Sequence, residues 1–398
     1  MGQNSIIIVG AGIAGLTAAK EIRTNSQDAQ IILISREDAL PYYRLSLTRY
    51  LAGEVEKKTL PVYPAEWYEK NAIQLLLGCE VTAIDRQGKS VTLSDGRSLA
   101  YDRLILTTGA RPSVPPIPGT DTSGVLTLRT MTDADQLLER LNHTRACIAI
   151  GGGLLGLETA GAIAHHGVGV TLLEVAPWLM PRQLNQTAAA ILKSQVERAG
   201  ISVREGVGIA QIVGKDKCEG VQLNSGEFIP GEFVMITAGV TPEIRLAKEA
   251  GLKTNRGVVV DQFMRTSDEA IYAAGDMAEY SEAPAGLWNT AQQQGRIAGL
   301  NAIGQGTPWQ IAPKTHNLKV LGLDVFSMGQ IQSSDKLLEK VDGEKYYGFT
   351  LQEGRVISGI VLGDRAFSTK VKQAIDKGRV FPQDAWDDVN ALISHIAG

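Results

Sequence analysis

The chain has 398 residues, which is too long for one ordinary domain and predicts two or three domains of about 150 residues each. Its 44% hydrophobic and 21% charged residues exclude a disordered chain, a collagen and a coiled coil, and no apolar run approaches the roughly 20 residues of a membrane-spanning helix. The net charge of −4 gives no support for nucleic acid as a partner. Because no basic or apolar leader opens the sequence and its three cysteines are scattered, we predict a cytoplasmic protein without a metal motif.

An internal repeat organises the first part of the chain. Residues 6–22 read IIIVGAGIAGLTAAKEI, and residues 147–163 read CIAIGGGLLGLETAGAI. Each copy predicts an apolar strand, a glycine-rich turn and a helix, and each is followed by a second apolar strand, at 30–35 and at 168–174. The pattern therefore predicts the same β-α-β unit twice, each with its own parallel sheet.

Shorter strands separated by turn residues follow each unit. We expect antiparallel strands at 81–86, 90–94 and 98–107 after the first unit, and at 201–205, 211–213, 220–223 and 233–237 after the second. The proline-rich segment 111–119 and the short segment 240–242 are the predicted connections between the two regions. From about residue 313 the pattern changes to strands and a final helix, which predicts a third, smaller α+β region.

Both glycine turns have the spacing GxGxxG, directly after a strand and directly before a helix. The first glycine permits the tight turn, the second lets a pyrophosphate approach the backbone, and the third lets helix and strand pack closely. The helix N-terminus offers free N–H groups to the phosphates. The sequence therefore predicts two dinucleotide sites, the first with Gly10, Gly12 and Gly15 and the second with Gly151, Gly153, Leu155 and Gly156.

A carboxylate at the end of the strand after each turn is expected to bind the adenine ribose. Glu174 ends the second strand of the second unit, 18 residues after Gly156, and no arginine follows it before Arg182, which favours NADH over NADPH. In the first unit Ser35 stands at the usual place, so Glu37 is the candidate, with its register left open. A solvated strand-end carboxylate is the structural alternative for Glu174.

Two dinucleotide sites in one chain suggest a bound flavin and a nicotinamide that comes and goes. We predict an α/β protein with two tandem Rossmann-like FAD/NAD(P)-binding domains and a small C-terminal α+β domain. The expected boundaries are 1–112 with 241–312 for the FAD-binding domain, 113–240 for the NAD(H)-binding domain, and 313–398 for the C-terminal domain. Gly239, next to the second connection, is counted with the nicotinamide site.

With these motifs the chain resembles the FAD-dependent pyridine nucleotide–disulfide oxidoreductase superfamily, and most of all its NADH:rubredoxin and flavorubredoxin reductase branch. The resemblance covers nearly the whole sequence. It implies contacts with bound FAD from several further segments: Ala14 in the first loop, Arg44 in PYYRLSL, Val81 near the adenine, Thr108, Gly109, Ala110 and Arg111 in TTGARP, Gly275 and Asp276 in AAGD, and Thr290 and Ala291 in WNTAQQQG.

The resemblance also implies a pair of charged residues beside the flavin and the nicotinamide. The family often has a lysine shortly after the PYxR segment. Here Arg49 stands there, and we expect it to pair with Glu158 of the second helix. A first-turn glutamate that stabilises its own helix is the alternative for Glu158. Disulfide reductases of the superfamily need a CxxxxC beside the flavin, and oxidases and peroxidases of the superfamily need one cysteine, but residues 37–50 contain none.

The missing cysteines favour an external electron acceptor. The resemblance then implies an NADH-dependent flavoprotein oxidoreductase in which a hydride passes from NADH to tightly bound FAD, and single electrons pass to a small iron protein such as rubredoxin. An NADH oxidase that reduces dioxygen to peroxide and an NADH-binding redox-sensing flavoprotein are the alternatives. Lys314, Lys319 and Arg365 are candidate charges for an acidic partner. The sequence does not identify the electron acceptor, does not distinguish a monomer from a dimer, and does not establish an absolute preference for NADH over NADPH.

Overall fold

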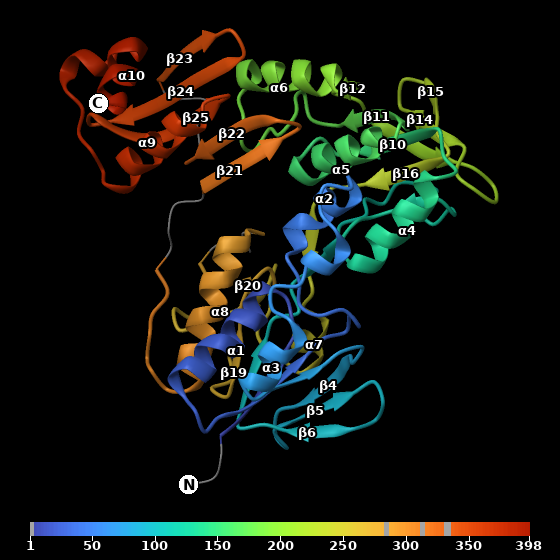
Figure 1. The fold of residues 1–398 in the computed structure, drawn as a ribbon, viewed down its shortest axis with the longest axis vertical. Helices are drawn as coiled ribbons and strands as arrows, with labels where there is room; N and C mark the ends of the chain where they lie inside the picture. Colours follow the sequence, from blue (N-terminus) through green and yellow to red (C-terminus); the bar gives the residue numbers. More distant parts are fainter. Residues whose placement is uncertain (1–3, 282–285, 311–314, 330–335) are drawn as a thin grey trace. The chain divides into compact units, whose positions relative to one another are not determined.

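The computed structural model describes residues 4–281, 286–310, 315–329 and 336–398 (Figure 1). The chain forms two compact units. Unit 1 comprises residues 1–113, 129–134 and 240–311, and unit 2 comprises residues 114–128, 135–239 and 312–398. The chain therefore passes more than once between the units, and the short segment 129–134 belongs to unit 1 although both of its flanks belong to unit 2.

Unit 1 is built on a parallel sheet with the strand order β19-β7-β1-β2-β3. Its inner strands β1 and β7 are rich in isoleucine and leucine and are almost fully buried, as parallel strands covered on both faces are. Helices α1 and α8 pack against each other in this unit (Figure 1). The bounds are β1 Ser5–Val9, α1 Ile13–Asn25, β2 Gln30–Ile34, β3 Ile73–Leu76, β7 Arg103–Leu106, β19 Ile271–Ala273 and α8 Trp288–Ala302.

A three-stranded antiparallel sheet follows β3, and the first two of its strands confirm the prediction for 81–94. It consists of β4 (Val81–Asp85), β5 (Ser90–Leu93) and β6 (Ser98–Ala100). The single strand expected at 98–107 is wrong, because the chain turns at Tyr101 and Asp102 and continues as β7 of the parallel sheet. There the Asp102 amide bonds to the carbonyl of Ser5, which places the apolar run 104–106 beside β1.

The rest of unit 1 consists of short elements around the sheet. The two predicted connections pair with each other: β8 runs antiparallel to β17. The bounds of these elements are η1 Arg44–Ser46, α2 Leu47–Leu51, η2 Lys57–Thr59, α3 Ala65–Lys70, β8 Ala110–Pro112, β17 Val240–Pro242, α7 Arg245–Glu249, β18 Val258–Val259 and β20 Ala278–Glu279.

Unit 2 contains a second parallel sheet, with the strand order β12-β11-β10-β16-β9, and an antiparallel sheet of β13, β14 and β15. The strands at 201–205 and 233–236 lie parallel to their neighbours, so their expected antiparallel pairing is wrong. The bounds are β9 Val125–Leu126, α4 Met131–Leu141, β10 Ala146–Ile150, α5 Leu154–His165, β11 Gly169–Glu174, α6 Gln186–Arg198, β12 Ile201–Glu205, β13 Ile209–Val213, β14 Gly220–Leu223, β15 Phe228–Pro230 and β16 Phe233–Ile236.

The C-terminal part of unit 2 is a five-stranded antiparallel sheet with the order β21-β22-β25-β24-β23, followed by helices. Its core is aromatic and includes the buried side chains of Phe326, Tyr347 and Phe349. The bounds are β21 Thr315–Val320, β22 Leu323–Met328, β23 Leu337–Asp342, β24 Lys345–Gln352, β25 Arg355–Leu362, α9 Arg365–Asp376, η3 Gln383–Trp386 and α10 Val389–Ala397. The predicted fold class, with two Rossmann-like regions and a small α+β region, is confirmed.

Candidate functional site

The first glycine loop joins β1 to α1 in unit 1. Gly10 has φ +108°, and a Cβ there would lie 2.3 Å from the carbonyl oxygen of Thr107. A Cβ on Gly15 would lie 2.0 Å from the carbonyl oxygen of Gly10. Both positions therefore exclude every side chain, as the roles of the first and third glycine require. Gly12, by contrast, has nothing within 4 Å of the position of a Cβ, so the backbone is open there.

Thr107 holds this loop in place from the end of β7. Its hydroxyl donates to the carbonyl oxygens of Val9 (3.1 Å) and Gly10 (2.7 Å), and it is buried. On the other side, Gly275 packs against Ala14 and Ala291: a Cβ on Gly275 would lie 3.1 and 3.6 Å from the methyl carbons of these alanines. These three predicted residues therefore bring the first turns of α1 and α8 together.

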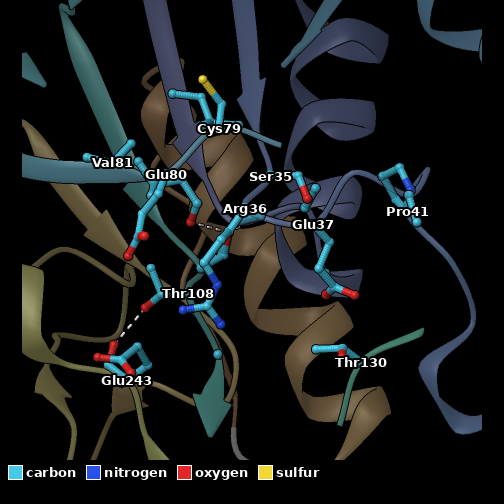
Figure 2. Close-up of a pocket in the computed structure, with 18 of the residues that line it drawn as sticks. Ser35, Arg36, Glu37, Pro41, Cys79, Glu80, Val81, Thr108, Thr130 and Glu243 are labelled. Atoms are coloured by element: carbon cyan, nitrogen blue, oxygen red, sulfur yellow. Dashed lines mark hydrogen bonds between the residues drawn. The ribbon is translucent and has the colours of Figure 1, made fainter. Parts of the chain in front are cut away.

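A pocket opens beside the loop, and 18 of its lining residues are drawn in Figure 2. Its walls come from the ends of β1, β2 and β7, the loop 35–44, the turn before β4, the segment 129–130 and residues 243–246. The pocket therefore gathers segments that are far apart in the sequence. Eight of the predicted residues line it: Gly10, Gly12, Glu37, Arg44, Val81, Thr108, Gly109 and Ala110.

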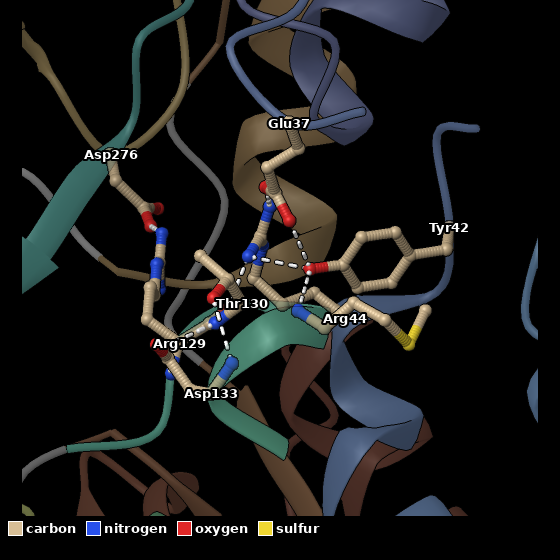
Figure 3. Close-up of polar contacts among 8 residues, drawn as sticks. Glu37, Tyr42, Arg44, Arg129, Thr130, Asp133 and Asp276 are labelled. Atoms are coloured by element: carbon tan, nitrogen blue, oxygen red, sulfur yellow. Dashed lines mark hydrogen bonds and ion pairs between the residues drawn. The ribbon is translucent and has the colours of Figure 1, made fainter. Parts of the chain in front are cut away.

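Glu37, Tyr42 and Arg44 form a hydrogen-bonded cluster on one wall of this pocket (Figure 3). Arg44 Nη2 lies 2.6 Å from one carboxylate oxygen of Glu37, and the Tyr42 hydroxyl donates to the other at 2.7 Å. The same hydroxyl accepts from Arg44 Nη1 at 3.0 Å. Burial raises the pKa of Tyr42 far above its usual value, and Glu37 reinforces this against the opposing charge of Arg44, so the hydroxyl remains a donor.

The segment 129–134 is tied to this cluster. The carbonyl of Arg129 accepts a hydrogen bond from Arg44, and the amide of Met131 donates to the Tyr42 hydroxyl at 3.0 Å. Arg129 Nη2 forms an ion pair of 3.1 Å with Asp276, and both side chains are about three-quarters or more buried (Figure 3). The predicted residue Asp276 does not line the pocket itself, but its ion pair holds the side chain of Arg129, which does line the pocket.

The lining residues fit FAD. The open backbone at Gly12 and the free N–H groups at the start of α1 suit a pyrophosphate. Glu37 offers a carboxylate to a ribose, the strand-end position that such sites use, although part of its hydrogen-bonding capacity is taken by Tyr42 and Arg44. Arg36, Arg44, Arg129 and Arg245 add positive charge around the same pocket.

The second glycine loop, in unit 2, repeats this construction. Gly151 has φ +111°, and a Cβ on Gly156 would lie 1.9 Å from the carbonyl oxygen of Gly151. Thr237, at the end of β16, donates to the carbonyls of Ile150 (3.0 Å) and Gly151 (3.2 Å), as Thr107 does in unit 1. Like Gly12, Gly153 has nothing within 4 Å of the position of a Cβ.

Glu174 is bound by the backbone around the second loop. Its carboxylate accepts from the amide of Gly152 at 2.6 Å and from the amide of Ala176 at 2.7 Å. A Cβ on Gly152 would lie 3.0 Å from a Glu174 oxygen and 2.6 Å from Leu179. The loop therefore fixes the direction of this carboxylate, and each oxygen retains a lone pair for a further donor.

The other predicted residues lie at more exposed places. Arg111 is 3.9 Å from Glu243, and Arg49 forms an exposed ion pair of 3.1 Å with Glu54. The proposed partner of Arg49, Glu158, is half-buried on α5 and belongs to the other unit, so their pairing stays a prediction. The remaining three are Thr290 in the first turn of α8, Leu155, 39% exposed at the start of α5, and Gly239, with φ +91°.

Sequence reasoning missed several residues that this structure brings to the sites. Thr107 and Thr237 follow apolar strands in ILTTG and MITAG, and this second repeat was the available signal. Arg129 had no such signal, because its segment lies within the predicted NAD(H)-binding region. Arg36, Glu80, Glu243 and Arg245 line the first pocket without belonging to a motif.

We also searched the described residues for metal sites, membrane-spanning helices, reactive thiols and the candidate charges for a partner. Among the described residues, no group of three or more histidine, cysteine or acidic side chains is placed to hold a metal ion, and no helix is both long and apolar enough to cross a bilayer. All three cysteines are buried free thiols. Of the candidate partner-binding charges, Lys319 and Arg365 are exposed in unit 2, and Lys314 lies outside the described residues.

Comparisons with protein families cover most of the chain. Residues 4–295 match the family described as pyridine nucleotide-disulphide oxidoreductase, and residues 315–379 match the rubredoxin NAD+ reductase C-terminal domain. The chain is 33% identical over 384 residues to the nitrite reductase [NAD(P)H] of Bacillus subtilis (strain 168), covering 95% of this chain and 48% of that relative. The chain thus spans about half the length of this relative, and 51% of an assimilatory nitrate reductase electron transfer subunit of the same organism.

Other relatives match from end to end. The chain is 30% identical over 398 residues to the NADH-rubredoxin oxidoreductase of Clostridium acetobutylicum, and the match covers 100% of both chains. The crystal structure of the C. acetobutylicum NADH:rubredoxin oxidoreductase superimposes with a TM-score of 0.84, at 30% identity, over 99% of this chain and 100% of that one. A ferredoxin reductase from Rhodopseudomonas palustris reaches 0.91 at 26% identity over 100% of both chains.

Proposed function

The chain belongs to the pyridine nucleotide-disulphide oxidoreductase family, and we propose that it is an FAD-dependent NADH oxidoreductase that passes electrons to a small iron protein such as rubredoxin. The end-to-end similarity to a relative named NADH-rubredoxin oxidoreductase carries this proposal. The match of residues 315–379 to the rubredoxin NAD+ reductase C-terminal domain supports it independently of the nucleotide-binding regions.

In this proposal FAD is held by unit 1. Bound FAD would accept a hydride from NADH and release electrons singly, which is chemistry of the cofactors and not of the protein. The first glycine loop and the start of α1 would hold the pyrophosphate, and Glu37 the adenine ribose. Tyr42 and Arg44 would fix the direction of Glu37, while Asp276 holds the guanidinium of Arg129 at the pocket.

NADH is held by unit 2 in the same proposal. The second loop and the start of α5 would bind its pyrophosphate, and Glu174, aimed by the amides of Gly152 and Ala176, would accept from the ribose hydroxyls. A carboxylate at this point repels the 2′-phosphate of NADPH, so we propose a preference for NADH. The orientation of the bound rings would then supply most of the rate enhancement.

We infer the kind of electron acceptor from a missing thiol, at the place where disulfide-reducing members of the family need a cysteine. Residues 37–50 contain no cysteine. Cys79 does line the first pocket, but it is 7% exposed, on the adenine side expected for Val81, and its sulfur contacts Arg97 and Asp95. An acceptor outside the chain is therefore needed, and a one-electron iron protein is the acceptor that the named relatives support.

An anaerobic stopped-flow experiment tests the proposal. The purified protein is reduced with one equivalent of NADH and then mixed either with rubredoxin or with air-saturated buffer, while flavin absorbance is followed. We expect fast reoxidation by rubredoxin and slow reoxidation by air. Fast reoxidation by air alone would instead support an NADH oxidase, and slow reoxidation by every acceptor, with a change of oligomer on reduction, would support a redox sensor.

The proposal has three further parts: the division into domains, a charged pair beside the reacting rings, and the cellular location. We retain the division into an FAD-binding domain (1–112 and 241–312), an NAD(H)-binding domain (113–240) and a C-terminal domain (313–398), as a finer division than the two units. We also propose that the pair Arg49 and Glu158 lies beside the reacting rings. A cytoplasmic location agrees with three buried free thiols.

A further inference from the structure

Glu205 connects a strand end of unit 2 to the loop that follows Glu174. It ends β12 as Glu174 ends β11, and the two residues lie opposite each other in the parallel register. One carboxylate oxygen of Glu205 accepts from the amide of Leu179 at 3.0 Å, and the other lies 2.8 Å from Lys193 Nζ. The Glu205 side chain is 15% exposed. Both of its oxygens therefore have partners inside unit 2.

The Leu179 amide belongs to the loop 175–184, which folds back onto the second glycine loop. The Leu179 side chain is fully buried, and its Cδ2 lies 2.6 Å from the position that a Cβ on Gly152 would take. The next amide, that of Met180, donates to the carbonyl of Gly152 at 3.1 Å. Gly152 is therefore held on both sides, its carbonyl by Met180 and its amide by Glu174.

This arrangement of the loop needs support from outside the loop. Met180 has φ +50°, a left-handed conformation that is costly for a residue with a side chain and persists only where the surroundings enforce it. A carboxylate that accepts from a backbone amide makes a strong, directed bond, and Glu205 supplies one at Leu179, immediately before Met180. The backbone after Glu205 adds a second support, because the amide of Gly206 donates to the carbonyl of Ala176 at 2.9 Å.

We propose that Glu205 is a positioning residue for NADH, which acts through its bond to the Leu179 amide. This bond keeps the loop 175–184 against Gly152 and so fixes the glycine loop and Glu174 for the nucleotide. The inference rests on the proposed function, in which unit 2 holds NADH. Loss of the bond releases the loop and weakens NADH binding, and it changes neither the FAD held by unit 1 nor the reduction of flavin once NADH is bound.

Three variants of the full chain separate the hydrogen bond of Glu205 from its charge. Glu205→Ala removes both, Glu205→Gln keeps an oxygen within reach of the Leu179 amide without the charge, and Glu205→Asp keeps the charge on a side chain that is too short for this bond. Glu232→Ala is the matched control. Glu232 also accepts from a backbone amide of unit 2, that of Arg145 at 2.9 Å, but before β16, at the end of the sheet away from the glycine loop.

Two properties of each variant are measured. The first is the NADH concentration that gives half-maximal anaerobic flavin reduction, together with the limiting rate and the FAD content. The second is the rate of trypsin cleavage after Arg182, an exposed residue of the loop 175–184, which reports release of the loop without any need for NADH.

We expect Glu205→Ala and Glu205→Asp to raise the half-saturating NADH concentration about tenfold, the effect of one lost hydrogen bond to a partly buried amide. The limiting rate and the FAD content should stay unchanged, and cleavage after Arg182 should be about fivefold faster. Glu205→Gln and Glu232→Ala should remain within about threefold of the unchanged protein in both measurements.

A larger effect of Glu205→Gln than of Glu205→Asp would mean that the charge acts by itself and would overturn the inference, and this comparison holds even where Glu205→Ala fails to fold. Normal half-saturation by Glu205→Asp, or an equal rise in Glu232→Ala, would overturn it as well. Failure of NADH to reduce the unchanged protein would overturn the proposed function, and the cleavage rates after Arg182 would still decide whether Glu205 holds the loop.

Discussion

The two glycine loops have the same backbone but differ at the end of the second strand. In both, the amide of the first glycine donates to a carbonyl at the end of the second strand, that of Ile34 in unit 1 and that of Leu173 in unit 2, each at 2.8 Å. Ser35 and Glu174 are therefore equivalent positions. Glu174 accepts a hydrogen bond from the amide of Gly152. In unit 1 the carboxylate that we propose for the ribose, Glu37, lies two residues after Ser35 and is held instead by Tyr42 and Arg44.

The two loops also differ at the residue between their first two glycines. In unit 2 it is Gly152, where a Cβ would lie 3.0 Å from a Glu174 oxygen, and in unit 1 it is Ala11. The smaller Ser35 is the residue of unit 1 that is equivalent to Glu174, which agrees with an alanine at this position. Under the proposed function, the two units would share one form of phosphate-binding loop and would hold the ribose in different ways.

The largest effect is expected where a side chain would meet the loop backbone. Gly15→Ala places a Cβ 2.0 Å from the Gly10 carbonyl, and Gly156→Ala places one 1.9 Å from the Gly151 carbonyl. Each should cost about 3 kcal/mol of local stability. We expect Gly15→Ala to be purified without FAD, as measured by flavin absorbance. We expect Gly156→Ala to retain FAD, but its steady-state rate should no longer saturate with NADH. Loss of FAD from both variants would contradict the assignment of one dinucleotide to each loop.

Asp276→Ala should have the next largest effect, and only on FAD. It removes the partner of the largely buried Arg129, and an uncompensated, partly buried charge costs about 2 kcal/mol. We expect FAD to bind about thirtyfold more weakly in equilibrium dialysis, with the KM for NADH unchanged. Asp261→Ala is the control, because its ion pair with Arg265 is more exposed and lies outside the pocket lining. An equal loss in the control would show general destabilisation of unit 1.

Gly152→Ala and Ala11→Gly test the difference between the loops directly. In Gly152→Ala the new Cβ meets the ends of Glu174 and Leu179, which can shift, so we expect the KM for NADH to rise about tenfold with FAD retained. Ala11→Gly should change FAD binding by less than about threefold, since it removes only a methyl group and adds backbone freedom. Equal effects of the two changes on their own cofactors would mean that the strand-end residue does not determine this position.

The smallest effect concerns acid stability of unit 1. Burial acts to raise the pKa of Asp268, but hydrogen bonds from Arg86 and the Ala270 amide outweigh it and hold the pKa below its usual value. A depressed pKa stabilises the fold above the unfolded-state pKa of about 3.9, and this stability is lost as pH falls through the folded-state pKa. Arg86→Leu should therefore cost about 1 kcal/mol at pH 7 in urea unfolding, and less below pH 4. A difference that grew with acidity would contradict this assignment.

The sequence predicted the loops and missed what supports them. Local spacing identified both GxGxxG turns, because each glycine role depends on neighbours within a few residues. Arg129 was missed because its role arises only when the segment 129–134 returns to the pocket from distant sequence. Thr107 was missed because its contact with Gly10 is also distant in sequence, and only the repeat of ILTTG in MITAG marked it. Strand direction failed for the same reason: 201–205 and 233–236 have turn residues nearby, but their pairing is set by the parallel sheet.

The most direct test of two dinucleotides in two loops is the Glu174→Arg variant, with Glu174→Gln as its control. The flavin content of each purified protein is measured first, and then the rate of anaerobic flavin reduction is measured against NADH and NADPH concentration. We predict unchanged FAD content in both variants. In Glu174→Arg the NADH concentration that gives half-maximal flavin reduction should rise at least tenfold, and NADPH should be favoured over NADH. In Glu174→Gln this concentration should change less. Loss of FAD from Glu174→Arg, with NADH use intact in the protein that keeps it, would contradict the account.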